Sequence, residues 1–539
     1  MTFDYNKFFP FEEERIEQTK SINFTLDAFL DKRKRFVVLE NPVGSGKSGI
    51  AITVAKYLSD KYRENGLYSQ GSYIITTQKI LQTQYANEFD FACNIWSKSN
   101  YRCTQTPKVE MSCELGQWLN SFSRTEKGKV IYNSNCPYKI DKKKFIDGDI
   151  GITNTQFLLN NIMYTDEIKR RNLLVVDECH TLESAIIEFV SMNFDGPMIE
   201  QELEINWMHC TENTKSENFV DWIKDIYVPA MKFKMSEIEN KLKKIKDSSK
   251  INSSHHQLLK KYEEYDRLIC HNSRCTLNFD PKNWVMSVDV NMQKVTIKPI
   301  FASLFSEWAL FRCAEKILLM SGTILDKEIF CRNLGIKIED CEFLSVDSSF
   351  PIENRPIIVL PVGSMNYKNI KETLPNLVMA IKELLKNHKN EKGIIHCHTY
   401  SNAKYIFDNI KDKRLLIHTS KTRDEILKQH IDSSDDTVIL SPSFTEGIDL
   451  YEDLSRWQVI CKVPYPYLGD KYVKEKMSRI KNWYEWETAK TIIQGSGRSV
   501  RSKTDTAVTY ILDSEFNNFF NKNNNLFPKW WKDAIQKYD

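Results

Sequence analysis

The sequence predicts an α/β protein with two parallel-sheet domains, the first of which is interrupted by a cysteine-rich insertion and a helical insertion. Two observations carry this prediction. Short β-branched runs alternate with helical stretches, and those runs are apolar throughout. Continuous apolar runs are typical of parallel strands buried on both faces, and the interleaved helices provide the covering layers. Length agrees, because 539 residues are too many for one hydrophobic core.

The predicted strands fall into two sets. The first set is 35–40, 73–77, 150–154, 173–178 and 317–323, and the second is 356–360, 393–399, 414–420, 437–443, 457–464 and 507–513. Between strands of the first set lie a segment with four cysteines and a segment rich in Glu, Lys and Asn. We therefore expect a first domain made of 1–92, 137–187 and 280–342, insertions at 93–136 and 188–279, and a second domain at 343–539.

Composition excludes several classes of protein. The N-terminus has no signal-peptide or transit-peptide pattern, and no run reaches the ~18 apolar residues of a membrane span. We expect a soluble intracellular protein, cytoplasmic or nuclear, without a membrane partner. A net charge of +3 neither requires nor excludes a polyanionic partner. The run "KRKR" at 32–35 is read as a solvated lead-in to the first strand, with a nuclear signal as the alternative.

The stretch "ENPVGSGKSG" follows the first predicted strand and precedes a helix. In this context Gly44, Ser45 and Gly46 let backbone N–H groups approach a polyphosphate. Lys47 then reaches the β- and γ-phosphates, Ser48 holds Mg²⁺, and the helix directs its positive end at the same anion. The sequence therefore predicts ATP binding, although Asn41 stands where the general P-loop pattern has its first Gly.

The stretch "LLVVDECH" ends another predicted strand and supplies two adjacent carboxylates. Hydrolysis of a nucleotide needs a carboxylate for the metal and a group that orients and deprotonates water. We assign the first role to Asp177 and the second to Glu178, and expect His180 to link this site to neighbouring motifs.

The stretch "QGSGRSVRS" lies before the last strand of the second set. Gln494, Arg498 and Arg501 are spaced by four and three residues, which predicts one face of a helix. A guanidinium on the γ-phosphate stabilises the charge of the transition state. We therefore expect Arg498 to complete catalysis across a cleft between the two domains.

These motifs occur in the order found in superfamily 2 helicases of the XPD/DinG group, and the sequence resembles that group from about residue 8 to residue 513. "FPFEEERIEQ" resembles its adenine-proximal motif, in which Arg15 and Gln18 match. "GITNTQFLL" (151–159) resembles the segment in which an Asn, here Asn154, ends a strand. "VVDECH" is similar to the DEAH-type motif II, "LMSGTILD" to motif III and "QGSGRSVR" to motif VI. "SFTEGIDLY" (443–451) resembles motif V, which contains Gly447 and Asp449.

The resemblance implies two RecA-like motor domains, an iron–sulfur domain and a helical arch. It implies an ATP hydrolase that moves along single-stranded DNA, generally 5′→3′, and opens DNA forks. Thr77, Asn154 and Thr445 are the implied DNA contacts, and the aromatic residues Trp96, Tyr101, Tyr465 and Tyr467 are further candidates for base stacking. We expect a monomer. Protein partners and the pathway, with DNA repair among the uses of such motors, stay open.

Cys93, Cys103, Cys113 and Cys136 share a short window, and a [4Fe–4S] cluster is held by four thiolates. Cys103 and Cys136 resemble the first and last cluster ligands of the group, which has two cysteines between them where this chain has only Cys113. Either Cys93 is the fourth ligand, or the cluster is incomplete or absent. "CHNSRC" (270–275) is read as structural.

Alternative functions stay open at this point. The chain is predicted to be a DNA helicase, but a translocase that remodels protein–DNA complexes without separating strands would carry the same motifs. A nucleotide-gated single-strand binding module is less favoured, because Lys47, Asp177, Glu178 and Arg498 are all present. An RNA helicase is a further possibility, since motors that track a backbone often accept either sugar.

Overall fold

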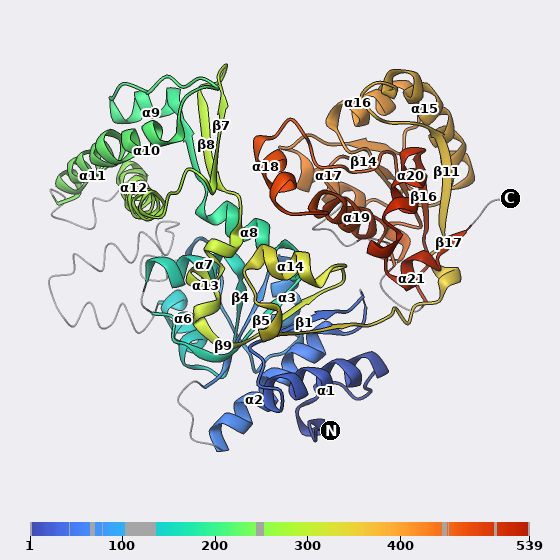
Figure 1. The fold of residues 1–539 in the computed structure, drawn as a ribbon, viewed down its shortest axis with the longest axis horizontal. Helices are drawn as coiled ribbons and strands as arrows, with labels where there is room; N and C mark the ends of the chain where they lie inside the picture. The colour runs from blue at the N-terminus through green and yellow to red at the C-terminus, as the bar shows by residue number, and fades with distance from the viewer. Residues whose placement is uncertain are drawn as a thin grey trace.

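The computed structural model describes residues 3–42, 44–64, 70–77, 79–102, 136–165, 167–243, 253–444, 450, 452–497, 499–500 and 504–536. Within these residues the chain forms two lobes, each built on a seven-stranded parallel sheet, and a third, three-stranded antiparallel sheet (Figure 1). The predicted α/β fold with two parallel-sheet domains is therefore confirmed.

The sheet of the first lobe has the strand order β10-β1-β9-β5-β2-β4-β3. Its interior strands consist of the apolar runs seen in the sequence and are buried on both faces, as β1 and β5 illustrate. The strands are β1 (Phe36–Glu40), β2 (Ser72–Thr76), β3 (Cys93–Asn94), β4 (Ile150–Asn154), β5 (Arg171–Asp177), β9 (Ala314–Ser321) and β10 (Cys341–Ser345).

Helices cover both faces of this sheet. One core contains side chains of α1 (Ile16–Leu30), α2 (Lys47–Glu64) and α3 (Lys79–Glu88). The core on the opposite face contains side chains of α6 (Pro137–Asp147), α7 (Thr155–Tyr164), α8 (Leu182–Val190), α13 (Ser306–Ala309) and α14 (Lys327–Leu334). The "KRKR" segment leads directly into β1, and its Lys32 pairs with Asp27 and Glu342, as expected of a solvated lead-in.

The sheet of the second lobe has the order β13-β14-β12-β15-β16-β11-β17. Its strands are β11 (Ile357–Gly363), β12 (Gly393–His396), β13 (Leu415–Ile417), β14 (Val438–Ser441), β15 (Trp457–Ile460), β16 (Val508–Asp513) and β17 (Ile535–Gln536). Its helices are α15 (Ile370–Asn387), α16 (Tyr400–Asn409), α17 (Arg423–Asp432), α18 (Lys471–Arg479), α19 (Trp483–Ser496), α20 (Glu515–Lys522) and α21 (Lys529–Lys532). Apolar side chains of α18 and α19 join the same buried cluster as those of α8 and α14, so the hydrophobic core is continuous between the lobes.

The insertion after α8 contains helices and a sheet. Its helices are α9 (Gly196–Leu203), α10 (Ser216–Trp222), α11 (Val228–Lys243) and α12 (Ser253–Leu277), with a π-helical turn at Ile223–Tyr227 between α10 and α11. The sheet pairs β6 (Met192–Asp195) with β8 (Lys294–Pro299), and β8 with β7 (Trp284–Asp289). This sheet includes residues beyond the expected boundary at 279. Residues 244–252, between α11 and α12, lie outside the described residues.

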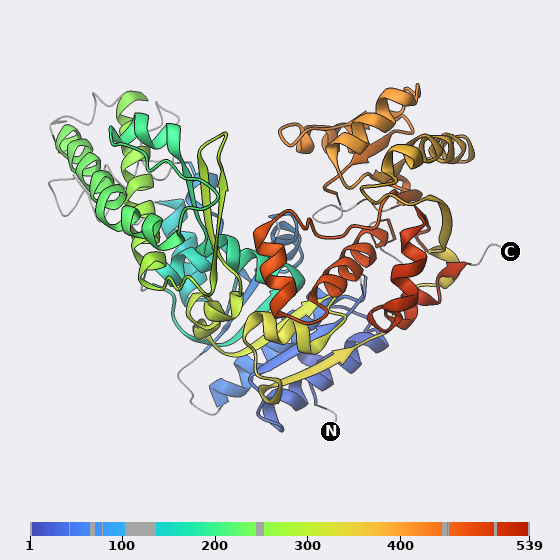
Figure 2. The ribbon, with the colours of Figure 1, turned by 45° about the horizontal axis from the view of Figure 1, so that its top comes forward.

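The second lobe contacts the insertion through α18, which lies beside β7 and β8 in Figure 2. Lys298 of β8 pairs with Asp470 at 3.4 Å, and its ammonium lies 4.2 Å from the ring centre of Tyr472. Arg479 at the other end of α18 donates to the Lys282 carbonyl at 2.6 Å. A rearrangement of the second lobe will therefore act directly on the base of the insertion.

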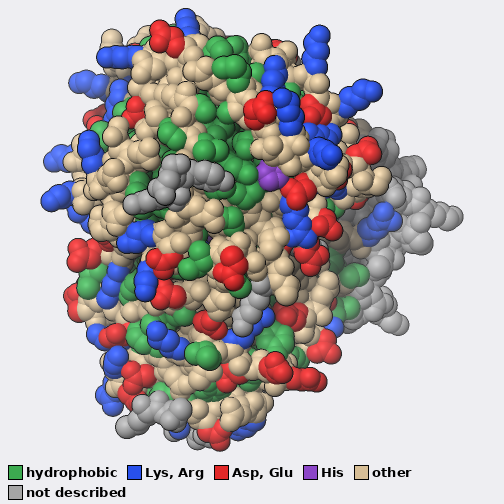
Figure 3. Space-filling view, turned by 90° about the vertical axis from the view of Figure 1, so that its right-hand side faces the viewer, with side chains coloured by type: hydrophobic (Ala, Val, Ile, Leu, Met, Phe, Trp, Pro, Cys, Tyr) green, Lys and Arg blue, Asp and Glu red, His purple; other side chains and the backbone are tan. Residues whose placement is uncertain are grey.

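Basic and acidic side chains are interspersed over the exposed face of the second lobe in Figure 3, in agreement with the net charge of +3. In the part of the chain that is described, no helix is both long enough and apolar enough to cross a membrane.

Candidate ATP site between the lobes

Three neighbouring strands of the first sheet end side by side and bring the predicted motifs together. β9 lies between β1 and β5, and the register pairs Glu40 with Ser321 and Asp177 with Met320. Because parallel strands end at the same edge of a sheet, the loop after β1 lies beside Asp177 and the segment after Ser321.

The phosphate loop has the backbone shape that its glycines permit. Gly44 and Gly46 both have φ of 76°, a left-handed conformation that favours glycine, and α2 begins at Lys47. Asn41 is buried and directs its amide toward α1, where Nδ2 donates to Ser21 Oγ at 2.9 Å. The departure from the general pattern at Asn41 therefore fixes the loop to α1.

Arg15 and Gln18 contact the same loop. Arg15 Nη1 donates to the Gly44 carbonyl, and Gln18 Nε2 donates to the Gly46 carbonyl at 3.1 Å. A Cβ added at Gly46 would collide with the Gln18 amide. The start of α1 and the phosphate loop are thus fitted to each other, as the likeness to an adenine-proximal motif leads us to expect.

Lys47, Glu178 and His180 form a continuous polar network. Lys47 Nζ lies 3.2 Å from Glu178 Oε1, and His180 Nδ1 lies 3.2 Å from Glu178 Oε2. His180 Nδ1 also lies 2.8 Å from Ser321 Oγ. Glu178 has φ of 53°, an uncommon value for a residue with a side chain. Such values tend to occur at functional turns, and this one belongs to the residue between Asp177 and the His180 turn.

The two carboxyl groups have opposite pKa shifts. Burial, together with the charge of Glu178, raises the pKa of Asp177 to about 6, although Lys47 acts in the opposite direction. Burial also opposes ionisation of Glu178, but Lys47 and His180 outweigh it and hold the pKa of that carboxyl well below its usual range. Asp177 Oδ2 accepts a hydrogen bond from the Tyr85 hydroxyl at 3.1 Å.

This donor set fits a divalent cation. Asp177 is a buried carboxyl whose pKa is raised by burial and by the charge of Glu178, and Mg²⁺ prefers carboxylate and hydroxyl oxygens. Ser48 is the second residue of α2, next to Lys47, and hydrogen-bonds to Glu88. Burial raises the pKa of Glu88, and the bond with Ser48 acts in the opposite direction. The Ser48 hydroxyl and the Asp177 carboxylate are therefore the groups that could hold the metal.

A loop after β9 connects this site to the second lobe. Glu40 Oε1 accepts hydrogen bonds from Ile324 N and Leu325 N, each at 2.7 Å, and Oε2 accepts one from Ser345 Oγ at 2.7 Å. From the second lobe, Trp486 Nε1 donates to the Ile324 carbonyl at 2.8 Å. Gln494 Nε2 donates to Thr323 Oγ1 at 2.9 Å. Side chains of both lobes therefore bind one short segment, 321–325. Its first residue, Ser321, is also the hydrogen-bond partner of His180.

Known proteins match this chain over both lobes. A family model described as "Helicase C-terminal domain" matches residues 381–534, and one described as "Type III restriction enzyme, res subunit" matches residues 9–217. The ATP-dependent DNA helicase CHL1 of Saccharomyces cerevisiae is 24% identical over 68% of this chain and 46% of its own length. The ATP-dependent DNA helicase DinG of Photobacterium profundum is 24% identical over 41% of this chain and 34% of its own length.

A solved structure of an XPD helicase superposes with a TM-score of 0.64 and 15% identity, covering 98% of this chain and 100% of that one. In sequence the chain is thus similar to ATP-dependent DNA helicases such as CHL1 and DinG. It spans less than half the length of CHL1 and about a third of DinG. At 15% identity the XPD structure supports the fold, in agreement with the two parallel sheets.

Several residues that the likeness to XPD/DinG helicases singles out lie outside the described residues: Cys103, Cys113, Thr445, Gly447, Asp449, Arg498 and Arg501. The expected helix through Gln494, Arg498 and Arg501 is wrong in its extent. α19 ends at Ser496 with Gly497 as its cap, and Ser499 and Val500 are not helical. Gly497, the cap residue, is a poor helix former, and beyond it the buried Ser499 hydroxyl donates to Ser455 Oγ at 2.8 Å.

Of the DNA contacts expected for an XPD/DinG-like helicase, Thr77 and Asn154 are described. The Thr77 hydroxyl is buried without a partner among the described residues. Asn154 caps α7, because its Oδ1 accepts from Phe157 N at 2.9 Å. Tyr467 is 79% exposed, whereas Tyr465 stacks on Tyr484 with ring centres 5.6 Å apart. Tyr467 is therefore the better candidate for base stacking.

The described cysteines do not fit a cluster held by both Cys93 and Cys136. Cys136 directly precedes α6, whereas Cys93 Sγ packs where a Cβ of Gly148, just beyond the far end of α6, would lie. The helix between them has 11 residues and is about 16 Å long, which is farther than the ligands of one cubane lie apart. Among the residues that the structure places, no three His, Cys, Asp or Glu side chains form a metal-binding group. The hypothesis that Cys93 is the fourth ligand is therefore not supported.

We expect a Cys93→Ser variant, purified without air, to keep the iron content of the parent protein, because Cys93 is remote from Cys136. Iron and acid-labile sulfide assays measure this directly. Cys275→Ser is the matched control, since Cys275 is buried and its thiol donates to the Val190 carbonyl. Loss of iron in Cys93→Ser alone would contradict this placement.

Sequence reasoning missed Tyr85, Glu40 and Trp486, whose polar groups reach the site from three separate elements. Tyr85 and Trp486 look like ordinary core aromatics in the sequence, and only the fold shows what their polar atoms contact. Glu40 could have been singled out from the sequence, because it ends an otherwise apolar strand. A carboxylate that is buried there must find hydrogen-bond donors.

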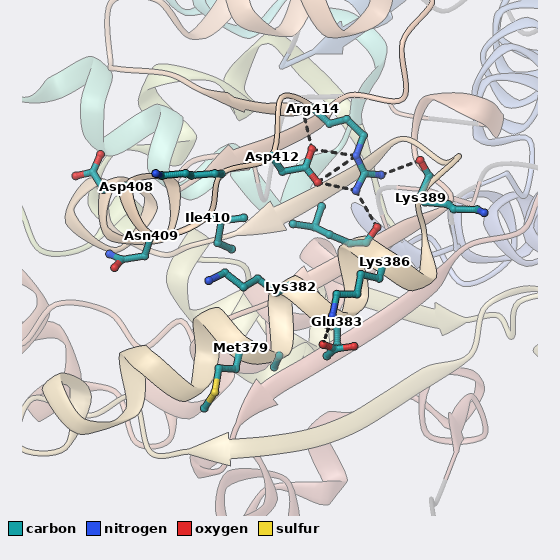
Figure 4. Close-up of a pocket in the computed structure, with 13 residues that line it drawn as sticks. Met379, Lys382, Glu383, Lys386, Lys389, Asp408, Asn409, Ile410, Asp412 and Arg414 are labelled. Carbon is teal, nitrogen blue, oxygen red and sulfur yellow. Dashed lines mark hydrogen bonds and ion pairs between the residues drawn. The ribbon is translucent and has the colours of Figure 1, made fainter.

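A cavity of about 1110 Å³ lies on the second lobe away from the ATP site (Figure 4). Arg414, which lines this cavity, pairs with Asp412 at 2.8 Å and donates to the carbonyls of Leu385, His388 and Lys389. This arginine stabilises the end of α15, and the cavity contains no residue of the predicted motifs.

Proposed function

We propose that this chain hydrolyses ATP to move along single-stranded DNA in the 5′→3′ direction and thereby separates duplexes at forks. The observation that carries the proposal is the binding of both lobes to segment 321–325. Because Ser321 in that segment contacts His180, a change at the nucleotide site is passed to the second lobe. The direction of movement rests on the likeness to XPD/DinG helicases alone.

In this proposal Lys47 neutralises the β- and γ-phosphates, and the N–H groups of Gly44 to Ser48 surround them. Ser48 and Asp177 hold Mg²⁺, which offsets the charge on the phosphate oxygens. Glu178 orients the attacking water and accepts its proton, and its low pKa keeps the carboxylate ionised for that role. Arg15 and Gln18 contact the adenine. His180 and Gln494 transmit to the second lobe whether ATP is bound.

Arg498 is proposed as the arginine finger, with Arg501, Gly447 and Asp449 as further contacts to ATP or Mg²⁺ from the second lobe. Support comes from α19, because Gln494 on its last turn already bonds to Thr323 in the first lobe. The segment that carries Arg498 therefore begins at the interface between the lobes. Closure of the cleft on ATP would place a guanidinium on the γ-phosphate.

A cavity of about 580 Å³ between the lobes supports a strand path. Lys462, Tyr465 and Tyr467 line it, and burial lowers the pKa of Lys462, so a phosphate there would restore a counter-charge. We propose that Thr77, Asn154 and Thr445 grip the backbone along this path. The helical insertion stands next to α18, where a strand leaving the cavity would be parted from its complement.

The deciding experiment uses duplexes with a single-stranded tail of either polarity. We expect strand separation only with ATP and only with a 5′ tail, and Lys47→Ala is the inactive control. Unwinding of 3′-tailed duplexes would reverse the proposed direction. ATP hydrolysis without strand separation would favour a remodelling translocase, and nucleotide binding without hydrolysis a binding module. Stronger stimulation of ATP hydrolysis by RNA than by DNA would change the substrate class.

A further inference from the structure

A small cavity at the junction of the lobes contains an arginine that no motif accounts for. The cavity, about 50 Å³, has walls from four regions of the chain: the phosphate loop, the linker between the lobes with the start of β11, the end of α19 with the segment after it, and α21. These walls are formed by Pro42, Ser348, Phe350, Arg355, Ile357, Ser496, Gly497, Val500, Trp530 and Trp531.

Arg355 has an incomplete set of partners. Its Nη1 donates to the Trp530 carbonyl at 2.7 Å, and its guanidinium lies 5.3 Å from the Trp530 ring centre. Its Nε is buried without a hydrogen-bond partner, and no ion pair joins it to any carboxylate in the described ranges. Burial lowers the pKa of Arg355, and only the charge of Asp533 opposes this. A half-buried cation in this state is costly unless an anion joins it.

The residues that form the walls indicate which anion would lie near Arg355. Pro42 stands two residues before Gly44 in the phosphate loop, and Gly497 directly precedes Arg498. The cavity is therefore bounded by the loop that surrounds a polyphosphate and by the segment that carries the proposed finger. Its volume is too small for a purine base but sufficient for the oxygens of one phosphate.

We propose that Arg355 contacts the polyphosphate of the bound nucleotide from the linker, as a further cation opposite Lys47. This inference rests on the proposed function, because it requires ATP in the phosphate loop. The guanidinium has five donors, of which the described structure uses only part, and it binds phosphate oxygens through two parallel hydrogen bonds. Since the linker joins β10 to β11, this contact would couple nucleotide occupancy to the hinge itself.

The opposing explanation is that Arg355 only fastens the linker to α21 through Trp530. The two explanations differ in their dependence on phosphate. A phosphate contact contributes to binding of ATP and ADP but not of AMP, whereas a fastening role affects all nucleotides equally or none.

The experiment measures Kd for a non-hydrolysable ATP analogue, ADP and AMP by displacement of a fluorescent nucleotide. For Arg355→Gln we expect the Kd of the ATP analogue to rise about ten- to a hundredfold, the range for a lost charge-assisted hydrogen bond. The Kd of AMP should change less than about twofold. Arg355→Lys, which keeps the charge, should restore part of the affinity. Arg414→Gln is the matched control, because it removes an arginine that donates to carbonyls on the far side of the same lobe.

Equal losses for all three nucleotides, or none for the ATP analogue, would overturn the role of Arg355. If Arg355→Gln unfolds at a lower temperature than the parent, the result for Arg355→Lys decides. Failure of the proposed function gives a different pattern, in which the parent protein binds no nucleotide or Lys47→Ala binds ATP as tightly as the parent.

Discussion

Lys47→Ala and Glu178→Gln are each expected to lower DNA-stimulated ATP hydrolysis to less than about a tenth of the parent rate while single-strand binding persists. Lys47 is the cation of the phosphate loop, and its 3.2 Å contact with Glu178 makes it the main group that keeps that carboxylate ionised. Glu178→Gln keeps the shape of the side chain but removes the group that accepts the proton from water. Phosphate release measures the first effect, and anisotropy of a labelled oligonucleotide measures the second.

The structure provides a matched control for these variants. Lys386 lies on α15 and its side chain is 69% exposed, with Glu383 as its partner. Lys386→Ala removes the same functional group as Lys47→Ala from a surface far from the phosphate loop, and its ATP hydrolysis should equal that of the parent. More than about a tenth of the parent rate in Lys47→Ala or Glu178→Gln would remove the basis for the assigned roles. Loss of DNA binding would place these residues on the strand path.

The two parallel sheets were predictable because the composition of each interior strand is enough to identify it as a strand. Runs such as "FVVLE" are apolar at every position, and only a strand buried on both faces needs that composition. The edge strands of the sheets have no such continuous apolar pattern. β10 is buried at its first residue and exposed at its last, and it joins the sheet through a register with β1 that is set by packing.

The antiparallel sheet of the insertion was missed for a different reason. β7 and β8 form a local hairpin with alternating burial, as β8 illustrates, so the pattern was present in the sequence. Their third strand, β6, lies about a hundred residues earlier and is four residues long. Such a long-range pairing depends on the course of the whole insertion, and no local rule gives it.

The candidate site likewise contains residues that could be located from the sequence and contacts that could not. Strand ends and glycine spacing located Lys47, Asp177 and Glu178, because these motifs are contiguous in the chain. The hydrogen bonds of Trp486 and Gln494 to segment 321–325 join residues more than 150 positions apart, and the sequence indicated only that the lobes should meet. The bond of Ser499 to Ser455 just beyond α19 joins residues 44 positions apart and is equally invisible before folding.

Lys476→Met is expected to destabilise the protein by about 3–5 kcal/mol, the range for breaking a buried ion pair by removing one partner. Lys476 on α18 pairs with Glu183 on α8, and their side chains are 2% and 11% exposed. The lysine also lies 4.7 Å from the ring centre of Trp483. Without it, the carboxylate of Glu183 would keep one described donor, Asn333 Nδ2 at 2.9 Å, and would stay buried between the lobes with an uncompensated charge. Urea unfolding followed by tryptophan fluorescence measures the loss.

A second variant separates the buried charge from lost packing. In Lys476→Met combined with Glu183→Gln the charge is gone, so most of the lost stability should return. Lys386→Met is the surface control, since Lys386 and Glu383 are both largely exposed, and its effect should stay below about 1 kcal/mol. If the double variant is no more stable than Lys476→Met, the cost comes from packing against Trp483. If Lys476→Met itself is as stable as the parent, this pair does not hold the lobes together.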